Sequence, residues 1–208
     1  HLPRKKTVKK SLMAAAVLAA SVSAHAHASE MNYTYVQAEY VSLADADADI
    51  DDFDFDLDGA GVRGSVALGQ DWYLTGEYAD TGASEFGIDL DVQTFGLGLG
   101  YHSAINDQAD FVAEVAALSM DIEILGFSED DQGYRGTAGV RWQIGANFEA
   151  IATANYTSYR ELGGGFHANL GAHFKFNENF GIVAEYQQGE IIDGLGESRY
   201  SAGIRASF

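Results

Sequence analysis

A two-residue alternation of apolar and polar side chains runs through segments of about ten residues along most of this chain. Such alternation is typical of β-strands, in which successive side chains point to opposite faces. Connections rich in Gly, Asn and Asp separate the segments, as hairpins require. The pattern predicts ten strands, or eight if one weak hairpin lies outside the sheet. We place them at residues 33–43, 59–68, 72–79, 93–102, 110–120, 133–144, 148–159, 166–175, 180–188 and 198–208.

The two faces of these strands differ in a way that predicts lipid on one side. One face carries aromatic rings at its ends and small groups between them, as from Phe148 through Ala152 to Tyr156. Rings of this kind suit the boundary between membrane and water. The opposite face collects charges that nearly balance, and this predicts a narrow lumen whose charges neutralise one another. The expected lumen network is Glu39, Arg63, Glu77, Glu114, Arg135, Arg141, Glu149, Lys175, Glu185, Arg199 and Arg205.

The connections alternate between short turns and longer acidic segments. The five longer segments, which follow the first strand and every second strand after it, contain 21 carboxylates. Short turns at one end and longer loops at the other are typical of outer-membrane barrels, whose turns face the periplasm. In the last strand, Tyr200, Ile204 and Phe208 resemble the C-terminal signal that the barrel insertion machinery recognises. We therefore expect an all-β fold, a closed antiparallel transmembrane β-barrel in a bacterial outer membrane.

The first 28 residues have the features of an export signal. A basic stretch begins at Arg4, an apolar core follows, and Ala26-His27-Ala28 forms an A-x-A cleavage site. We expect residues 1–28 to be removed and residues 29–208 to form the barrel. The remaining segment has seven Lys and Arg residues against 31 Asp and Glu residues, a formal net charge of −24. This charge argues against nucleic-acid binding, and the absence of cysteine excludes disulfides.

The first acidic segment contains the one pattern that suggests a metal. Asp54, Asp56 and Asp58 match positions one, three and five of a calcium-binding EF-hand loop, but position twelve is Ser65, which offers no bidentate carboxylate. We expect a solvated acidic rim, with weak binding of Ca²⁺ or Mg²⁺ as the alternative, and no other cofactor. In the same segment the apolar residues occupy odd-numbered positions, whereas the outward apolar residues of the following strand occupy even-numbered positions. A β-bulge at residues 59–61 would reconcile the two, and an irregular loop is the alternative.

Three histidines fall on the predicted lumen face. His102, His167 and His173 have Glu114 and Glu185 as candidate neighbours, so a metal site or an acid–base pair is an alternative to plain hydrogen bonding. We favour hydrogen bonding. The serines show no nucleophile elbow, and no nucleophile, base and orienting group come together in the sequence. We therefore expect no enzyme activity.

Several stretches resemble a family of short barrels from Gram-negative bacteria. The runs NYTYVQAEYV, GAGVRGSVALGQDWYLTGEY, FGLGLGYH, FEAIATANY and HFKFNENFGIVAEY are similar to those of quorum-signal- or diffusible-factor-related outer-membrane proteins. The similarity covers nearly the whole chain after the signal and rests on strand pattern and composition. It implies an outer-membrane location, a barrel fold, and a link to biofilm or envelope physiology. It supplies no functional residues.

We interpret the chain as a structural or interaction protein of the cell envelope, in contact with outer-membrane lipid and lipopolysaccharide through its acidic loops. Its extracellular partner is not identified by the sequence. One alternative is a small diffusion channel, because ten strands enclose slightly more space than eight. Another is a soluble exported barrel that binds a ligand, with apolar side chains inside and charges outside. The direction of the apolar face distinguishes this last alternative from a membrane barrel.

Overall fold

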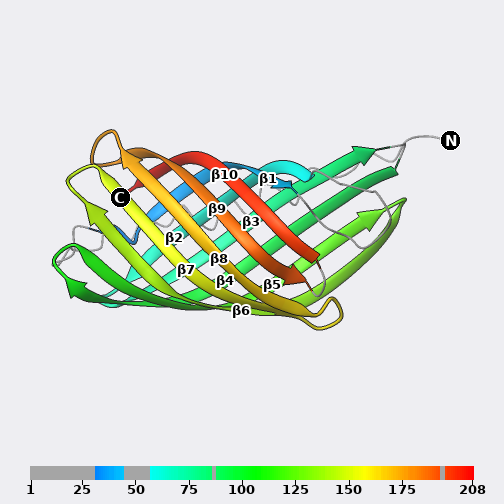
Figure 1. Cartoon of the computed structure of the whole chain (residues 1–208), viewed down its shortest axis with the longest axis horizontal. Helices are drawn as coiled ribbons and strands as arrows, with labels where there is room; N and C mark the ends of the chain where they lie inside the picture. The colour runs from blue at the N-terminus through cyan, green and yellow to red at the C-terminus, as the bar shows by residue number, and fades with distance from the viewer. Residues whose placement is uncertain (1–30, 45–56, 86–87, 193–194) are drawn as a thin grey trace.

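The computed structural model describes residues 31–44, 57–85, 88–192 and 195–208, and every regular element within them is a β-strand. Ten strands, each antiparallel to its neighbours, close into a barrel in which β1 pairs with β10 (Figure 1). The expected fold and strand number are confirmed. The described residues include no helix that is long and apolar enough to cross a membrane. The strands are β1 Tyr35–Ala44, β2 Leu57–Leu68, β3 Trp72–Glu85, β4 Ile88–Asn106, β5 Ala109–Ile124, β6 Phe127–Ile144, β7 Phe148–Tyr159, β8 Gly164–Lys175, β9 Phe180–Ile192 and β10 Leu195–Ser207.

Apolar side chains point outward from the barrel wall and polar side chains point inward. Val115 is 66% exposed and Leu97 57% exposed on the outer face, whereas Gln37 is fully buried inside. In a water-soluble protein this arrangement would leave a large apolar surface without a partner. Hydrocarbon around the barrel supplies that partner, and closure leaves no unpaired strand edge facing it.

The two ends of the barrel differ. Four short connections, at residues 69–71, 107–108, 145–147 and 176–179, lie at one end together with the C-terminus, and we call this the turn end (Figure 1). The opposite end is the hairpin end, where β3–β4 and β5–β6 extend furthest. Positive φ angles at Gly69 and Gly145 allow two of the short turns.

The strands continue further at the hairpin end than the sequence interpretation placed them. Residues 121–132 were expected to be an acidic loop, but only residues 125–126 lie outside strands β5 and β6. The alternation persists there with its sense reversed: Val115 faces outward near the middle of β5, whereas Asp121 is exposed on the same face and Met120 is buried inside. This reversal marks the level at which the surroundings of the wall change from hydrocarbon to water.

The expected β-bulge at residues 59–61 is wrong. Within its described length, β2 pairs residue by residue with β1 and with β3, without a shift in register. Leu57 is consequently on the inward face, where it is buried. For Leu57, the parity difference that suggested a bulge is the same reversal of faces that occurs on β5. Phe53, Phe55, Asp54 and Asp56 lie outside the described residues.

The tip of the β5–β6 hairpin offers a test of local backbone strain. Leu125 and Gly126 have φ angles of 51° and 83°, as a type I′ turn requires. Leucine is disfavoured there because its Cβ is crowded in the left-handed region, whereas asparagine is tolerated. We expect Leu125→Asn to raise the free energy of unfolding in detergent micelles by roughly 1 kcal/mol. Gly126→Ala should lower it, and an unchanged value for both variants would contradict the assigned turn.

Candidate functional site: the polar lumen

One wall of the lumen is almost free of side chains. The inward positions of the middle of β4 are Gly96, Gly98 and Gly100. A Cβ at Gly96 would lie 2.8 Å from Cγ of Glu77, and one at Gly100 would overlap the ring of Tyr73. The side chains of β3 can therefore lie flat across β4 and reach toward the far side of the barrel.

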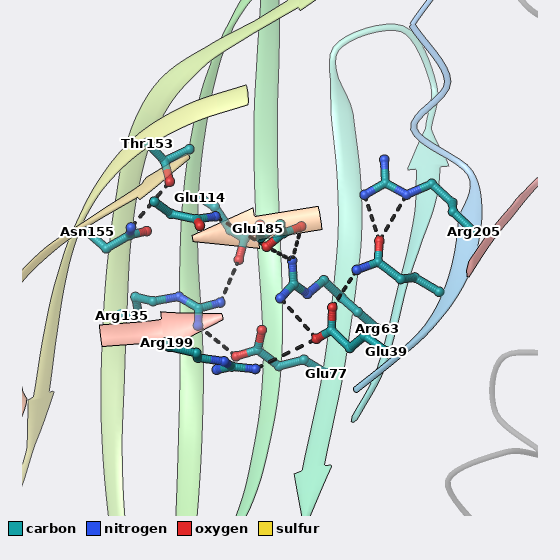
Figure 2. A network of polar contacts seen from close by, with 12 residues as sticks. Glu39, Arg63, Glu77, Glu114, Arg135, Thr153, Asn155, Glu185, Arg199 and Arg205 are labelled. Atoms are coloured by element: carbon teal, nitrogen blue, oxygen red, sulfur yellow. Dashed lines mark hydrogen bonds and ion pairs between the residues drawn. The ribbon is translucent and has the colours of Figure 1, made fainter. Parts of the chain in front are cut away.

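Arg63 on β2 joins two glutamates from separate strands at the centre of the network in Figure 2. Its Nη1 donates to both carboxylate oxygens of Glu185 on β9, at 3.0 and 2.9 Å. Its Nη2 lies 3.3 Å from Oε1 of Glu39 on β1. Because β2 and β9 are separated by β1 and β10 in the ring, this arginine links positions that the sheet itself does not pair.

Arg135 on β6 makes a second link of the same kind. Its Nη1 lies 2.7 Å from Oε1 of Glu77 on β3, and its Nη2 lies 3.4 Å from Oε1 of Glu114 on β5. Figure 2 shows this group beside the Arg63 group, so the two arginines and four carboxylates form one layer. We call it the ion-pair layer: Glu39, Arg63, Glu77, Glu114, Arg135 and Glu185.

The other predicted lumen charges also lie on inward positions. Arg141 pairs with Glu149, with Nη2 and Oε1 2.6 Å apart, and Arg199 lies 3.7 Å from Glu39. Two cations contact amides instead of carboxylates. Arg205 donates to Oε1 of Gln37, and Lys175 donates to Oε1 of Gln143. The structure thus places all eleven predicted residues in the lumen and brings nine of them into ion pairs.

Sequence reasoning missed two lumen residues at the turn end. Asp110 begins the predicted strand at residues 110–120 but is not in the expected lumen network; it is 1% exposed and accepts a hydrogen bond from the Tyr33 hydroxyl at 2.8 Å. The lumen network was predicted from charged residues, and the Gln37 side chain was missed because its amide is neutral. Position 110 lies on the same face of the strand as Glu114, so the two-residue period alone is enough to predict that Asp110 points inward.

The histidines have neighbours other than those expected. Nδ1 of His102 lies 3.5 Å from Asp110, and Nδ1 of His173 lies 3.9 Å from Glu149. Neither contact involves Glu114 or Glu185. In the described residues no three His, Asp or Glu side chains come close enough together to hold a metal ion. Asp58, the one described member of the EF-hand pattern, lies on β2 and interacts with Tyr40 and Ser42.

The hairpin end of the lumen is apolar. Leu118 and Met120 of β5 pack there with Tyr159 of β7, and Leu162 of the β7–β8 connection packs against them. Asp131 on β6 holds that connection in place, because its carboxylate accepts hydrogen bonds from the backbone N–H groups of residues 160–162 at 2.9–3.2 Å. A buried apolar cluster with a tied loop therefore lies beyond the ion-pair layer.

Between its two ends the lumen contains a polar cavity of about 150 Å³. Its lining includes Ser65, Thr75, Asn155 and Asn169 together with the ion-pair layer. A cavity of this size and polarity can hold a cluster of water molecules or a small polar solute.

The predicted insertion signal lies on the lipid-facing side. Tyr200, Ile204 and Phe208 are all exposed on the outer face of the last strand and its end. Recognition of these residues by the barrel insertion machinery stays a prediction.

A protein-family model described as "Outer membrane protein beta-barrel domain" matches residues 12–208. Among solved structures, the NanC porin is 9% identical, with 83% of this chain and all of that chain covered and a TM-score of 0.53. The translocator domain of the autotransporter NalP from Neisseria meningitidis is 12% identical, with 96% and 94% covered and a TM-score of 0.49. The Ail protein of Yersinia pestis is 15% identical, with 86% and 100% covered and a TM-score of 0.41. Comparison with curated proteins gave no match.

The likeness to the NanC porin, at 9% identity, shows the fold and no more. Together with the outward apolar face, the family match places the chain in the bacterial outer membrane. The alternative of a soluble ligand-binding barrel is wrong, because it requires apolar side chains inside and charges outside. The turn end therefore faces the periplasm and the hairpin end faces the cell exterior.

Proposed function

We propose, from the chain's membership of the outer membrane protein β-barrel family, that this protein is a non-enzymatic surface-interaction protein whose lumen does not conduct solutes. The ion-pair layer carries this proposal. Arg63 and Arg135 each reach carboxylates on strands that are not their neighbours, so charged side chains cross the path that a solute would take. Opening that path would leave buried charges without partners, which is costly.

The hairpin end supports the same conclusion. Solutes that entered from outside would meet the apolar cluster around Leu118 and Met120 before they met the ion-pair layer. The connection that carries Leu162 is tied by Asp131. Two different kinds of barrier therefore lie in series, one apolar and one ionic. A narrow pore would need both to move.

Single-molecule recording in planar lipid bilayers tests the closed lumen. The purified protein is expected to insert without discrete conductance steps, and the double variant Glu77→Gln/Arg135→Gln, which removes one cross-lumen pair, serves as the control for a loosened layer. Regular conductance steps from the unmodified protein would support the alternative of a small diffusion channel and would overturn the proposal.

The interaction half of the proposal rests on the outward carboxylates of the projecting hairpins. Asp80, Asp89 and Asp91 on β3 and β4, and Asp121 and Asp130 on β5 and β6, are exposed on the outer face of the wall. Carboxylates at this level lie beside the headgroups of the outer leaflet. Divalent cations prefer oxygen ligands, so Mg²⁺ or Ca²⁺ would bridge these groups to lipopolysaccharide phosphates. The resemblance to quorum-signal- or diffusible-factor-related proteins adds the hypothesis of a biofilm role.

Binding to lipopolysaccharide with and without divalent cations tests this contact. The protein in detergent micelles should bind lipopolysaccharide when Mg²⁺ is present and lose that binding with a chelator. The variant Asp89→Asn/Asp91→Asn/Asp121→Asn should behave as the chelated protein does, because it retains shape and hydrogen-bonding groups without the charge. Lipopolysaccharide binding that is unchanged by the chelator and by the substitutions would contradict the bridging role.

A further inference from the structure

Residues 31–34 leave the wall and cross the lumen at the turn end. Strand β1 begins at Tyr35, and in the ring β6 lies five strands from β1 in either direction. Nevertheless Nη2 of Arg141 on β6 donates to the backbone oxygen of Asn32 at 3.2 Å. The guanidinium carbon of Arg141 also lies 4.2 Å from the centre of the Tyr33 ring. The segment therefore extends from its own strand to the opposite wall.

Tyr33 makes the side-chain contacts that hold this segment against the opposite wall. Its hydroxyl donates to Oδ2 of Asp110 on β5 at 2.8 Å, and its ring stacks on His102 of β4 with centroids 3.8 Å apart. The Tyr73 ring of β3 lies 5.1 Å away. With Arg141, four consecutive strands contact this side chain, which is only 5% exposed.

The segment is fixed at its other side near the seam between β1 and β10. The Asn32 side chain accepts a hydrogen bond from the Thr34 backbone N–H at 2.6 Å and donates to the Phe208 backbone oxygen at 2.8 Å. Thr34 accepts a hydrogen bond from the backbone N–H of Phe208 at 3.0 Å and, through Oγ1, one from that of Ala67 at 3.1 Å. The segment thus has a firm base in the wall, and the Tyr33 side chain extends from that base to the opposite strands.

We propose that Met31–Thr34 forms a strap that closes the periplasmic mouth of the lumen, with Tyr33 as its latch, and that releasing the latch opens the polar cavity to the periplasm. Tyr33 of the strap lines the cavity, so the strap forms part of its floor. Met31 packs beside Tyr33 with Val112, which also lines the cavity. The opening is compatible with the closed lumen proposed above, since the ion-pair layer remains between the cavity and the exterior.

The strap can move without loss of any strand pairing. The ladder between β1 and its two neighbours starts at Tyr35, so residues 31–34 contribute no pair to it. Release of Tyr33 requires one buried hydrogen bond and three ring contacts to break. The opened cavity would admit water and small polar solutes, because Ser65, Thr75 and Asn169 are among the side chains that line it.

Cysteine accessibility tests the strap, because the chain has no cysteine of its own. The variant Thr75→Cys places one thiol in the cavity wall with little change of volume. Its reaction with a small, charged, membrane-impermeant thiol reagent is measured in detergent micelles. We expect Thr75→Cys/Tyr33→Ala to react about tenfold or more faster than Thr75→Cys, as the loss of a hydrogen bond to a charged group implies. Ser84→Cys, exposed at the hairpin end, should react equally fast in both backgrounds.

The variant Thr75→Cys/Tyr33→Phe covers the case in which Tyr33→Ala does not fold. Phenylalanine keeps the stacking on His102 and loses the bond to Asp110, so an intermediate rate is expected. Folding is checked by heat-dependent migration on gels. Slow reaction in both Tyr33 variants while the barrel is folded would overturn the strap, and so would fast reaction of Thr75→Cys with Tyr33 intact. Neither result depends on whether lipopolysaccharide binds.

Discussion

Replacement of Arg63 by methionine is expected to lower the free energy of unfolding by about 3–5 kcal/mol, because it leaves two buried carboxylates without their cation. Glu185 would lose both bonds at 3.0 and 2.9 Å. Glu39 would keep the hydrogen bond from the Gln37 amide at 2.6 Å, with Arg199 at 3.7 Å as its remaining cation. Methionine fills much of the same volume, so the loss would come from charge. Urea unfolding in detergent micelles measures it.

Lys175→Met is the matched control for Arg63→Met. Lys175 also points into the lumen, but its hydrogen bond goes to the neutral amide of Gln143. Its removal leaves no carboxylate uncompensated, so a loss of about 1 kcal/mol or less is expected. The double variant Arg63→Met/Glu185→Gln should recover part of the stability lost in Arg63→Met. If Arg63→Met and Lys175→Met were equally stable, the ion-pair layer would not be holding the lumen together.

Val115→Arg is expected to lower the free energy of unfolding in lipid vesicles by about 2–4 kcal/mol, because it places a charge on the lipid face near the bilayer midplane. Val115 is among the most exposed apolar side chains and pairs with Leu99 on one side and Gly136 on the other. The fraction of protein that inserts during refolding should fall in parallel. Both quantities can be followed by heat-dependent migration on gels.

Asp121→Arg provides a control on the same strand and the same face. It lies six residues beyond Val115, about 20 Å along the strand, at the level where the outer face is polar. An arginine there meets water and the carboxylate of Asp130 across the ladder, so stability should change little. Equal losses for Val115→Arg and Asp121→Arg would show that the wall at Val115 does not face hydrocarbon.

The alternation of side chains was sufficient to predict the barrel, the strand number and the inward parity of the eleven charged residues of the expected lumen network. It failed where the surroundings of the wall change. On β5 the outward positions run from Val115 to Asp121, and the loss of the apolar outer face there wrongly predicts the end of the strand. Strand propensity itself does not change there. A polarity reversal with the same two-residue period is the signal of a strand that leaves the membrane.

Contacts across the lumen could not be predicted because they depend on the stagger of the strands around the ring. Parity placed Glu114 and His173 inside, yet Glu114 contacts Arg135 and His173 lies near Glu149. The strap was missed for a related reason. Tyr33 was included in the first strand because it continues the alternation, and no local pattern indicates that the chain turns across the barrel before Tyr35.

Fluorescence quenching of the two native tryptophans tests the orientation of the barrel wall most directly. Trp72 and Trp142 are the only tryptophans of the chain, and they are 47% and 52% exposed on the outer face near the turn end. In vesicles containing brominated phospholipids we expect strong quenching, greatest for bromines near the headgroups, and little quenching by aqueous iodide. Strong quenching by iodide with none by brominated lipid would mean that these rings do not face the membrane, and would contradict the account.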